Sequence, residues 1–308
     1  MEIKTVSIVG LGALGILFGT QLSKKMPFEN LRIIADKNRS ERYAKDLIYC
    51  NNESYNFQYI APETKCAPAD LVIFAVKFNG LDAAIKAASN QIGENTIILS
   101  ALNGISSEEI LGNAFGIDKV LYCVAQGMDA VKVDNHLTYS NKGILCFGEK
   151  EPNIISEKVK RLSSFFDKVD FPYETVLNMY QRQWGKLMLN VGVNQTVAVY
   201  EGNYGTIQKE GSARETMISA MKEVMALSSF EGVTLTNSDL EYWLSVLATL
   251  NPNGKPSMRQ DLENNRNSEV ELFSGTIIRL CEKYNVETPV NQMLYKKIKT
   301  IEENFKNL

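Results

Sequence analysis

The sequence predicts two domains: an α/β domain, with a mostly parallel sheet and helices on both of its faces, and an all-α domain after it. Three observations support this prediction. The 308 residues are enough for two domains, short apolar runs alternate with helix-compatible stretches in the first half, and apolar residues recur at helical spacing through most of the second half. We place the boundary near residue 175, which gives domains of residues 1–175 and 176–308.

The first domain begins with a strand and a helix. Residues 5–10 form a short apolar run typical of a buried strand, and residues 13–24 carry apolar side chains at helical spacing. Because helix-compatible segments lie between the earlier of the strand-like runs that follow, the order predicts a parallel sheet. These runs are residues 31–35, 71–76, 96–100 and 120–124.

Beyond Gly127 the pattern changes. We expect antiparallel strands at residues 136–139 and 143–148, an amphipathic helix at 153–166 and a last strand at 169–173. From residue 178 onward the sequence predicts helices almost throughout. Interruptions are expected at residues 201–205 and in the turn-rich segment 251–256.

The composition excludes several classes of protein. A formal net charge of −3 with interspersed signs gives no broad basic field, so we expect neither a nucleic-acid nor a membrane partner. The five cysteines are scattered and the single histidine is His136, which predicts free thiols and no metal site. Residues 1–4 lead into an apolar strand without the features of a signal peptide, and no apolar stretch is long enough to span a membrane. The expected location is the cytoplasm.

A glycine-rich turn follows the first strand. In a GxGxxG turn the first glycine permits the tight bend, the second lets a pyrophosphate approach the backbone, and the third allows helix and strand to pack closely. The helix that follows offers its free N–H groups to the anion. An ordinary strand-to-helix turn is the alternative, but the flanking strand and helix favour a Rossmann domain that binds a dinucleotide. The residues of the turn are Gly10, Leu11, Gly12, Ala13, Leu14 and Gly15.

The choice of dinucleotide depends on the end of the second strand. Asp36 stands there, and an acidic residue at this place usually binds the ribose hydroxyls and favours NAD. Lys37, Arg39 and Arg42 follow closely and can instead bind the phosphate of NADP. Solvated charges at the start of a helix are the alternative for these three. The residues therefore leave NADH and NADPH open.

Polar residues form a stripe on one predicted helix of the second domain. Lys186, Asn190 and Asn194 are spaced four apart, so they share one face, while most of their neighbours are apolar. Burying such a stripe without partners would be costly. A substrate with carbonyl and carboxylate oxygens would supply partners, and a partly desolvated lysine can protonate the alkoxide that forms when hydride reaches a ketone. A solvated or capping lysine is the alternative.

Several segments together resemble ketopantoate reductase, also called 2-dehydropantoate 2-reductase. The resemblance implies reduction of ketopantoate, a small 2-oxo acid, to pantoate by NADPH, on the route to pantothenate and coenzyme A. NADH stays possible because Asp36 stands where the family commonly has an arginine for the phosphate of NADPH. The segments are, in order, Gly10–Gly15, Ala75-Val-Lys77, Leu102-Asn-Gly104, Trp184 to Asn190 with Asn194, and Pro256 to Leu262 followed by Glu269.

The resemblance also implies roles for single residues. Lys186 matches the general acid, and Glu269 matches a glutamate that interacts with the substrate. The residues expected to contact the substrate are Asn103, Asn190, Asn194 and Ser257. Those expected to contact the cofactor, besides the glycine-rich turn, are Asp36, Lys37, Lys77, Asn103 and Glu269.

Each of these roles has a structural alternative. Lys77 can simply end a strand, and Asn103 with Gly104 can form an ordinary turn. Ser257 can cap a helix, and Glu269 can be a solvated helix charge.

Two departures from the family concern the substrate. The segment Asn203-Tyr204-Gly205 replaces a more usual proline-asparagine-glycine turn. Gly254 stands where some members carry a substrate-binding asparagine, for which Asn251 or Asn253 is a substitute. The alternative functions are a related NAD(P)-dependent dehydrogenase acting on another 2-oxo or 3-hydroxy acid, and a non-catalytic dinucleotide sensor. The apolar helical half is compatible with a homodimer.

Overall fold

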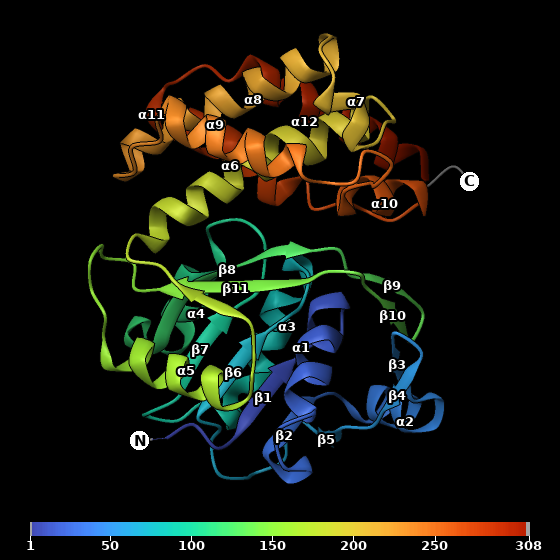
Figure 1. The fold of residues 1–308 in the computed structure, drawn as a ribbon, viewed down its shortest axis with the longest axis vertical. Coiled ribbons are helices and arrows are strands. Elements are labelled where there is room, and N and C mark those ends of the chain that lie inside the picture. The colour runs from blue at the N-terminus through green and yellow to red at the C-terminus, as the bar shows by residue number, and fades with distance from the viewer. Residues whose placement is uncertain (1, 306–308) are drawn as a thin grey trace. The chain divides into compact units, whose positions relative to one another are not determined.

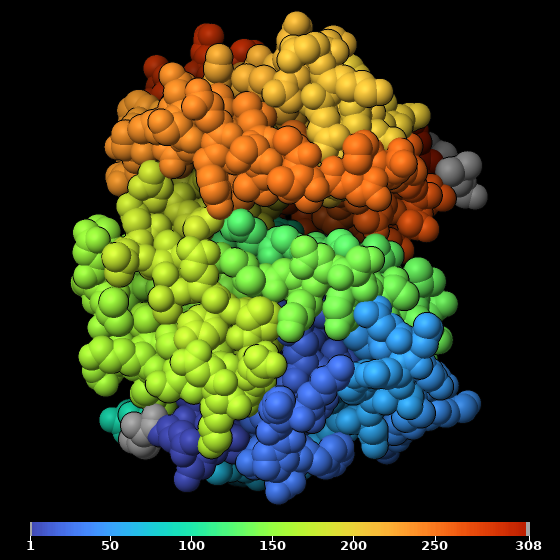
Figure 2. All heavy atoms as spheres, viewed as in Figure 1, coloured from blue at the N-terminus to red at the C-terminus, as the bar shows by residue number. Residues whose placement is uncertain are grey.

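The computed structural model describes residues 2–305, and the chain divides into two compact units. The first consists of Met1–Leu102 and Ser106–Tyr180, and the second of Asn103–Ile105 and Gln181–Leu308. Figure 2 draws all heavy atoms and shows that, within each unit, side chains fill the spaces that a ribbon drawing leaves empty. The short segment Asn103–Ile105 follows a strand of the first unit but belongs to the second by its contacts.

An eight-stranded sheet forms the centre of the first unit (Figure 1). Its strand order is β12-β11-β8-β7-β6-β1-β2-β5, and every neighbouring pair is parallel except β11 with β8. The predicted, mostly parallel sheet is therefore confirmed. The strands are β1 Val6–Val9, β2 Leu31–Ile34, β5 Gln58–Ile60, β6 Leu71–Phe74, β7 Ile97–Ser100, β8 Val120–Met128, β11 Lys142–Gly148 and β12 Tyr173–Thr175.

Helices cover both faces of this sheet because its central strands are buried on both sides. The apolar residues of β1 are divided between two separate cores, one on each face. One core is completed by α1 and α5 and the other by α3 and α4, whereas α2 contributes no buried residue. These helices are α1 Ala13–Ser23, α2 Lys37–Asp46, α3 Leu81–Ala88, α4 Ser107–Phe115 and α5 Glu157–Lys168.

A second sheet, which the sequence analysis did not predict, has four short strands in the order β4-β3-β10-β9. The strands expected at residues 136–139 and 143–148 are present as β10 and β11, but they lie in different sheets. Each pairs antiparallel with another strand, β10 with β9 and β11 with β8. The other three strands of this sheet were not expected, because runs of three residues carry little periodicity. The strands of this sheet are β3 Ile48–Cys50, β4 Glu53–Tyr55, β9 Val131–Val133 and β10 His136–Thr138.

The strand expected at residues 169–173 is wrong, because β12 begins only at Tyr173. Val169 and Phe171 are buried. Their apolar side chains, separated by Asp170, gave the alternation of apolar and polar residues that is typical of a strand. Asp170 between them has a φ of +55°, a left-handed conformation that interrupts an extended run. Pro172 follows and has no N–H to donate to a neighbouring strand.

The helix expected at residues 153–166 is present as α5 but begins at Glu157. Ser156 is its N-cap, and the Ser156 hydroxyl accepts a hydrogen bond from the backbone N–H of Val159 at 3.2 Å. This cap satisfies one of the free N–H groups of the first turn and therefore fixes the start of the helix.

The second unit is helical, as predicted, and its breaks at residues 201–205 and 251–256 separate α6 from α7 and α9 from α10. A π-helix of five residues, Glu271–Gly275, runs directly into α11. The α-helices are α6 Met179–Val199, α7 Tyr204–Gln208, α8 Ser212–Ser228, α9 Asn237–Ala248, α10 Ser257–Glu263, α11 Thr276–Tyr284 and α12 Pro289–Asn304.

Within residues 2–305, no helix has both the length and the apolar character needed to cross a membrane. In the same part of the chain, no three His, Cys, Asp or Glu side chains gather in a way that would hold a metal ion. The five cysteines are free thiols.

Candidate functional site

The glycine-rich turn connects β1 to α1, and the fold itself explains two of its three glycines. Gly10 has a φ of +98°, and a Cβ atom there would lie 2.6 Å from Val76 Cγ1. A Cβ atom at Gly15 would collide with the carbonyl oxygen of Gly10. The tight turn and the close approach of helix and strand therefore require glycine at both positions.

Gly12 is different, because the surrounding protein does not require a glycine there. Its φ of −73° is accessible to any residue, and a Cβ atom would meet the Ala75 carbonyl oxygen at an ordinary distance of 3.5 Å. Gly12 is the N-cap of α1 and lines a cavity. Because glycine has no side chain, it offers no side-chain hydrogen bond to the N–H groups of the first helical turn. A ligand lying against the backbone, such as a pyrophosphate at the helix N-terminus, would require this glycine.

A cavity of about 570 Å³ lies beside the turn. Its walls come from the carboxyl ends of β1, β2 and β6 together with parts of α2 and α3, all within the first unit. In a parallel sheet this edge is where ligands bind. The turn, the uncapped helix and the cavity together fit a dinucleotide. The lining residues used below are Gly10, Gly12, Asp36, Arg39, Arg42 and Lys77.

Asp36 lines this cavity and also begins α2. Its Oδ1 accepts a hydrogen bond from the backbone N–H of Arg39 at 2.9 Å, and its Oδ2 lies 3.4 Å from Arg39 Nε. The carboxylate is therefore held in place by its role as N-cap. It can still accept hydrogen bonds from ribose hydroxyls, because an ionised carboxylate has about four acceptor sites.

Arg39 and Arg42 also line the cavity, whereas Lys37 lies elsewhere. Lys37 lines a second cavity of about 600 Å³ and lies 3.9 Å from Glu41. Residues two apart on a helix do not share a face, so Lys37 and Arg39 point in different directions. Of the three basic residues, Arg39 and Arg42 therefore line the cavity beside the glycine-rich turn and Lys37 does not.

Lys77 follows β6 and lines the same cavity as the glycine-rich turn. Its side chain is exposed, and its carbonyl oxygen accepts a hydrogen bond from the N–H of Gly80 at 2.9 Å. Lys77 thus both ends a strand region and stands at the wall of the candidate cofactor cavity.

The polar stripe of the second unit lies on α6, which is continuous from Met179 to Val199. Lys186 and Asn190 are partly buried, and Asn194 is only 7% exposed. α9 approaches α6 closely, since a Cβ atom at Gly185 would collide with the Trp243 indole. The stripe is therefore part of a packed helix rather than a solvated face.

Asn103 and Glu269 lie together in the second unit although 166 residues separate them in sequence. The Asn103 amide Nδ2 donates a hydrogen bond to Glu269 Oε2 at 3.3 Å. The chain then turns at Gly104, which has a φ of +91°. Two residues that the resemblance places at the substrate are thus in contact, and Glu269 is not merely a solvated helix charge.

α6 is also tied to the segment that follows Glu269. The Gln195 side chain accepts a hydrogen bond through Oε1 from the N–H of Ser274, in the π-helix, at 3.2 Å. Gln195 is fully buried and follows Asn194 directly. This contact places one end of the polar stripe against the π-helix, which begins two residues after Glu269.

Ser257 is the first residue of α10 and is exposed. The N-cap of that helix is Pro256, so the structure does not support the alternative that Ser257 caps it. A role for Ser257 at the substrate stays a prediction.

Gly254 has a structural reason for lacking a side chain. A Cβ atom there would lie 3.1 Å from the Tyr204 ring, so an asparagine would have to displace that ring. The Gly254 carbonyl oxygen accepts a hydrogen bond from the N–H of Tyr204 at 3.0 Å. Asn251 Oδ1 accepts one from the N–H of Asn253 at 3.0 Å, so Asn251 shapes this turn.

Three residues that hold the segment around Glu269 were not expected from the sequence: Ser268, Glu302, which binds Ser268, and Gln195, which binds Ser274. In the sequence Glu302 stands among charged residues near the end of an amphipathic helix, where a solvated face is the ordinary interpretation. Its burial, at 6% exposed, comes from contacts with a distant turn and leaves no local signal.

Family models match both halves of the chain. The model described as ketopantoate reductase PanE/ApbA matches residues 6–152, and its C-terminal counterpart matches residues 178–302. Among curated proteins, the chain is 26% identical over 238 residues to a 2-dehydropantoate 2-reductase of Aquifex aeolicus, which is 76% of each chain. It is 24% identical over 300 residues to that of Pyrococcus horikoshii, covering 96% of this chain and 97% of the relative.

Solved structures share the fold. A PanE/ApbA family ketopantoate reductase from Ralstonia eutropha has a TM-score of 0.83 at 23% identity, and D-mandelate dehydrogenase with NADH and anilino(oxo)acetate has 0.85 at 19%. A dimeric ketopantoate reductase from Staphylococcus aureus has 0.78 at 21% identity. Each comparison covers 98% of this chain and 99% of the other. The predicted Rossmann domain followed by a helical domain is confirmed.

Proposed function

This chain belongs to the ketopantoate reductase family of NAD(P)-dependent oxidoreductases, and we propose that it reduces ketopantoate to pantoate. Its product would serve the synthesis of pantothenate and coenzyme A. In this proposal the first unit holds the dinucleotide, and the second unit provides the side chains that bind and protonate the 2-oxo acid.

The hydrogen bond between Asn103 and Glu269 carries this proposal. The two residues come from separate segments of the resemblance, and they lie 3.3 Å apart in a partly buried place. An amide and a carboxylate held together in this way form a polar site on an otherwise packed helical unit. Such a pair suits recognition of a small hydroxylated acid, because its remaining donors and acceptors can bind hydroxyl and carbonyl groups.

The first unit suits the dinucleotide because of the glycine-rich turn and its cavity. Gly12 and the N-terminal N–H groups of α1 would hold the pyrophosphate, and Asp36, Arg39 and Arg42 would hold the adenosine end. When bound, the dinucleotide would supply the hydride for the ketone carbon of the acid.

Lys186 supplies the proton. When the carbonyl carbon gains a hydride, its oxygen becomes an alkoxide and takes a proton from the Lys186 ammonium, which then regains one from water. Lys186 lies partly buried on α6, on the same face as Asn190 and Asn194, which supports this role. Asn190 and Asn194 bind the oxygens of the acid, and Glu269 orients the lysine or a substrate hydroxyl.

NADPH is the dinucleotide we propose. Two cavity-lining arginines, Arg39 and Arg42, outnumber the one carboxylate, and that carboxylate is already engaged by Arg39. The arginines can therefore bind a phosphate on the ribose. NADH is the alternative, because Asp36 can bind the unmodified ribose hydroxyls.

A related 2-oxo acid is the alternative substrate. The observation that favours it is Gly254, where any side chain would have to shift the Tyr204 ring by a few tenths of an ångström. The structural similarity to D-mandelate dehydrogenase makes the 2-oxo acid that corresponds to mandelate a useful comparison compound.

We keep the cytoplasm as the expected location and a homodimer as the expected assembly. The Staphylococcus aureus relative is dimeric, which supports the second expectation. Light scattering on the purified protein would measure the mass of the assembly directly.

The purified protein should oxidise NADPH when ketopantoate is added. We would measure kcat/KM for ketopantoate and for the 2-oxo acid of mandelate, with NADPH and NADH at matched concentrations. Highest efficiency with ketopantoate supports the proposed substrate, and highest efficiency with the other acid supports the alternative. Absence of turnover with any 2-oxo acid would contradict both.

A further inference from the structure

The segment that carries Glu269 joins α10 to the π-helix and is irregular on both sides. Ser268 precedes Glu269, and the π-helix Glu271–Gly275 begins two residues later. A π-turn is rare, and it occurs most often at functional sites. The direction of the Glu269 side chain therefore depends on how this short segment is held.

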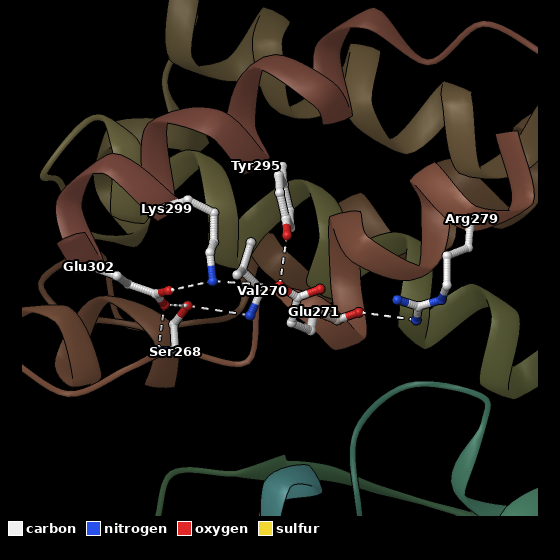
Figure 3. A network of polar contacts seen from close by, with 7 residues as sticks. All are labelled: Ser268, Val270, Glu271, Arg279, Tyr295, Lys299 and Glu302. Atoms are coloured by element: carbon white, nitrogen blue, oxygen red, sulfur yellow. Dashed lines mark hydrogen bonds and ion pairs between the residues drawn. The ribbon is translucent and has the colours of Figure 1, made fainter. Parts of the chain in front are cut away.

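Glu302 of α12 holds the residue before Glu269. Glu302 Oε1 accepts two hydrogen bonds from Ser268, one from the backbone N–H and one from the hydroxyl, each at 2.7 Å (Figure 3). Glu302 Oε2 lies 3.3 Å from Lys299 Nζ. A carboxylate that is only 6% exposed would be costly to bury without such partners.

The same helix, α12, also holds Glu271, the second residue after Glu269. The Tyr295 hydroxyl donates a hydrogen bond to Glu271 Oε1 at 2.7 Å, and Lys299 Nζ lies 3.5 Å from the same oxygen (Figure 3). Tyr295, Lys299 and Glu302 are spaced by four and three residues, so they lie on one face of α12. One face of one helix therefore binds both Ser268 and Glu271, on either side of Glu269.

We infer that Glu302, acting through Ser268, is a positioning residue that fixes Glu269 for its interaction with Asn103 and the 2-oxo acid. Glu302 touches neither the reacting atoms nor the dinucleotide in this assignment. It restricts the backbone beside Glu269, and Glu271 with its partners restricts the other side. The inference rests on the proposed function for the role of Glu269, but the contacts that hold the segment stand independently of it.

The first test compares three variants on α12. Glu302→Ala removes both hydrogen bonds to Ser268, Glu302→Gln keeps an acceptor oxygen for them, and Glu303→Gln alters an exposed neighbour as a matched control. Since a displacement of about 1 Å can reduce catalysis about 100-fold, kcat/KM for the 2-oxo acid should fall roughly 10- to 100-fold in Glu302→Ala. Glu302→Gln and Glu303→Gln should stay near wild type.

A double-mutant cycle distinguishes positioning from general stabilisation. If Glu302 acts through Glu269, then adding Glu302→Ala to Glu269→Gln should reduce kcat/KM by less than about twofold further. An equal loss in both backgrounds, or wild-type kinetics in Glu302→Ala, would overturn the inference.

A structural readout does not depend on turnover. In crystal structures of Glu302→Ala and Ser268→Ala, the distance from Asn103 Nδ2 to Glu269 Oε2 should grow beyond about 3.6 Å. Ser268→Ala keeps the backbone hydrogen bond to Glu302 and serves if Glu302→Ala fails to fold. An unchanged distance would overturn the inference. A longer distance in a protein whose wild type reduces no 2-oxo acid would instead support the positioning and contradict the proposed function.

Discussion

The two units build their candidate sites in different ways. In the first unit, a strand, a turn and a helix that follow one another in sequence provide Gly10, Gly12 and Gly15 within six positions. In the second unit, Asn103, Lys186 and Glu269 come from three distant segments, and a tertiary hydrogen bond joins Asn103 to Glu269. A site built from consecutive residues is visible in the sequence, whereas a site assembled by packing becomes visible only through resemblance or structure.

In the proposed mechanism Lys186 of the second unit supplies the proton, so Lys186→Ala should have the largest effect. kcat for reduction of the 2-oxo acid should fall about 100- to 10,000-fold, the usual contribution of general acid catalysis. The Kd of NADPH, measured by fluorescence titration without the acid, should change by less than about twofold, because the proposed pyrophosphate and adenosine contacts lie in the first unit. Lys222→Ala, on the exposed side of α8, is the matched control. Undiminished turnover in Lys186→Ala would remove the lysine from the reaction.

Two substitutions in the glycine-rich turn of the first unit separate an effect on protein stability from an effect on dinucleotide binding. Gly15→Ala should lower the free energy of unfolding by about 1–3 kcal/mol, because its Cβ would collide with the Gly10 carbonyl oxygen. Gly12→Ala should leave the melting temperature nearly unchanged and raise the Kd of NADPH about tenfold, equal to about 1.4 kcal/mol. Thermal melting and fluorescence titration of both variants provide the readouts. If Gly12→Ala binds NADPH normally, the pyrophosphate does not lie against this residue.

The strands that could be predicted from the sequence are those with a clear local pattern of apolar residues. The buried strands β1, β2, β6 and β7 are runs of four apolar or mostly apolar residues, and they were predicted in order. The three-residue strands β3, β4, β5 and β9 were missed because so short a run has little periodicity, although β10, which is equally short, was predicted. Local backbone effects at Asp170 and Pro172 displaced one predicted strand.

The candidate sites show the limit most clearly. Arg39 and Lys37 are equally plausible in the sequence, and only the direction of each side chain on α2 separates them. Glu302 resembles a solvated helix residue until α12 packs on the segment that contains Ser268. Residues whose role depends on long-range packing could not be identified from local pattern.

The cofactor end of the first unit provides a finer test. Asp36→Asn keeps an N-cap for α2 but removes one negative charge beside the ribose. At about 4 Å in water one such charge is worth about 1 kcal/mol, so the NADPH to NADH ratio of kcat/KM should rise about fivefold. Arg42→Gln should shift the ratio in the opposite direction. A ratio that neither variant changes would show that another part of the cavity selects the dinucleotide.

The smallest expected effect concerns Asp70, which binds the residues directly before β1, the strand that leads into the glycine-rich turn. Asp70 Oδ2 accepts hydrogen bonds from the N–H groups of Lys4 and Thr5 and from the Thr5 hydroxyl, each at 2.9 Å. Burial raises the pKa of the Asp70 carboxyl, but the hydrogen bonds from Lys4 and Thr5 outweigh it, so the pKa lies below its usual value. This stabilisation is present above the unfolded pKa of about 3.9 and is lost as pH falls through the lower folded value.

Asp70→Asn should therefore be less stable than wild type by about 1 kcal/mol at pH 7. The difference should shrink as the pH falls below about 4. Thermal melting of both proteins at several pH values measures this difference in stability. A difference that is the same at pH 7 and below about pH 4 would contradict the role of the ionised carboxylate.

The most direct test of the whole account is to follow the hydride. The protein would be incubated with ketopantoate and NADPH that carries deuterium at the transferred position of nicotinamide C4, and the product would be analysed by mass spectrometry. We predict pantoate with one deuterium bound to its C2 carbon, formed in a one-to-one ratio to the NADPH that is oxidised. Unlabelled pantoate, or oxidised NADPH without any pantoate, would contradict hydride transfer to ketopantoate by this protein.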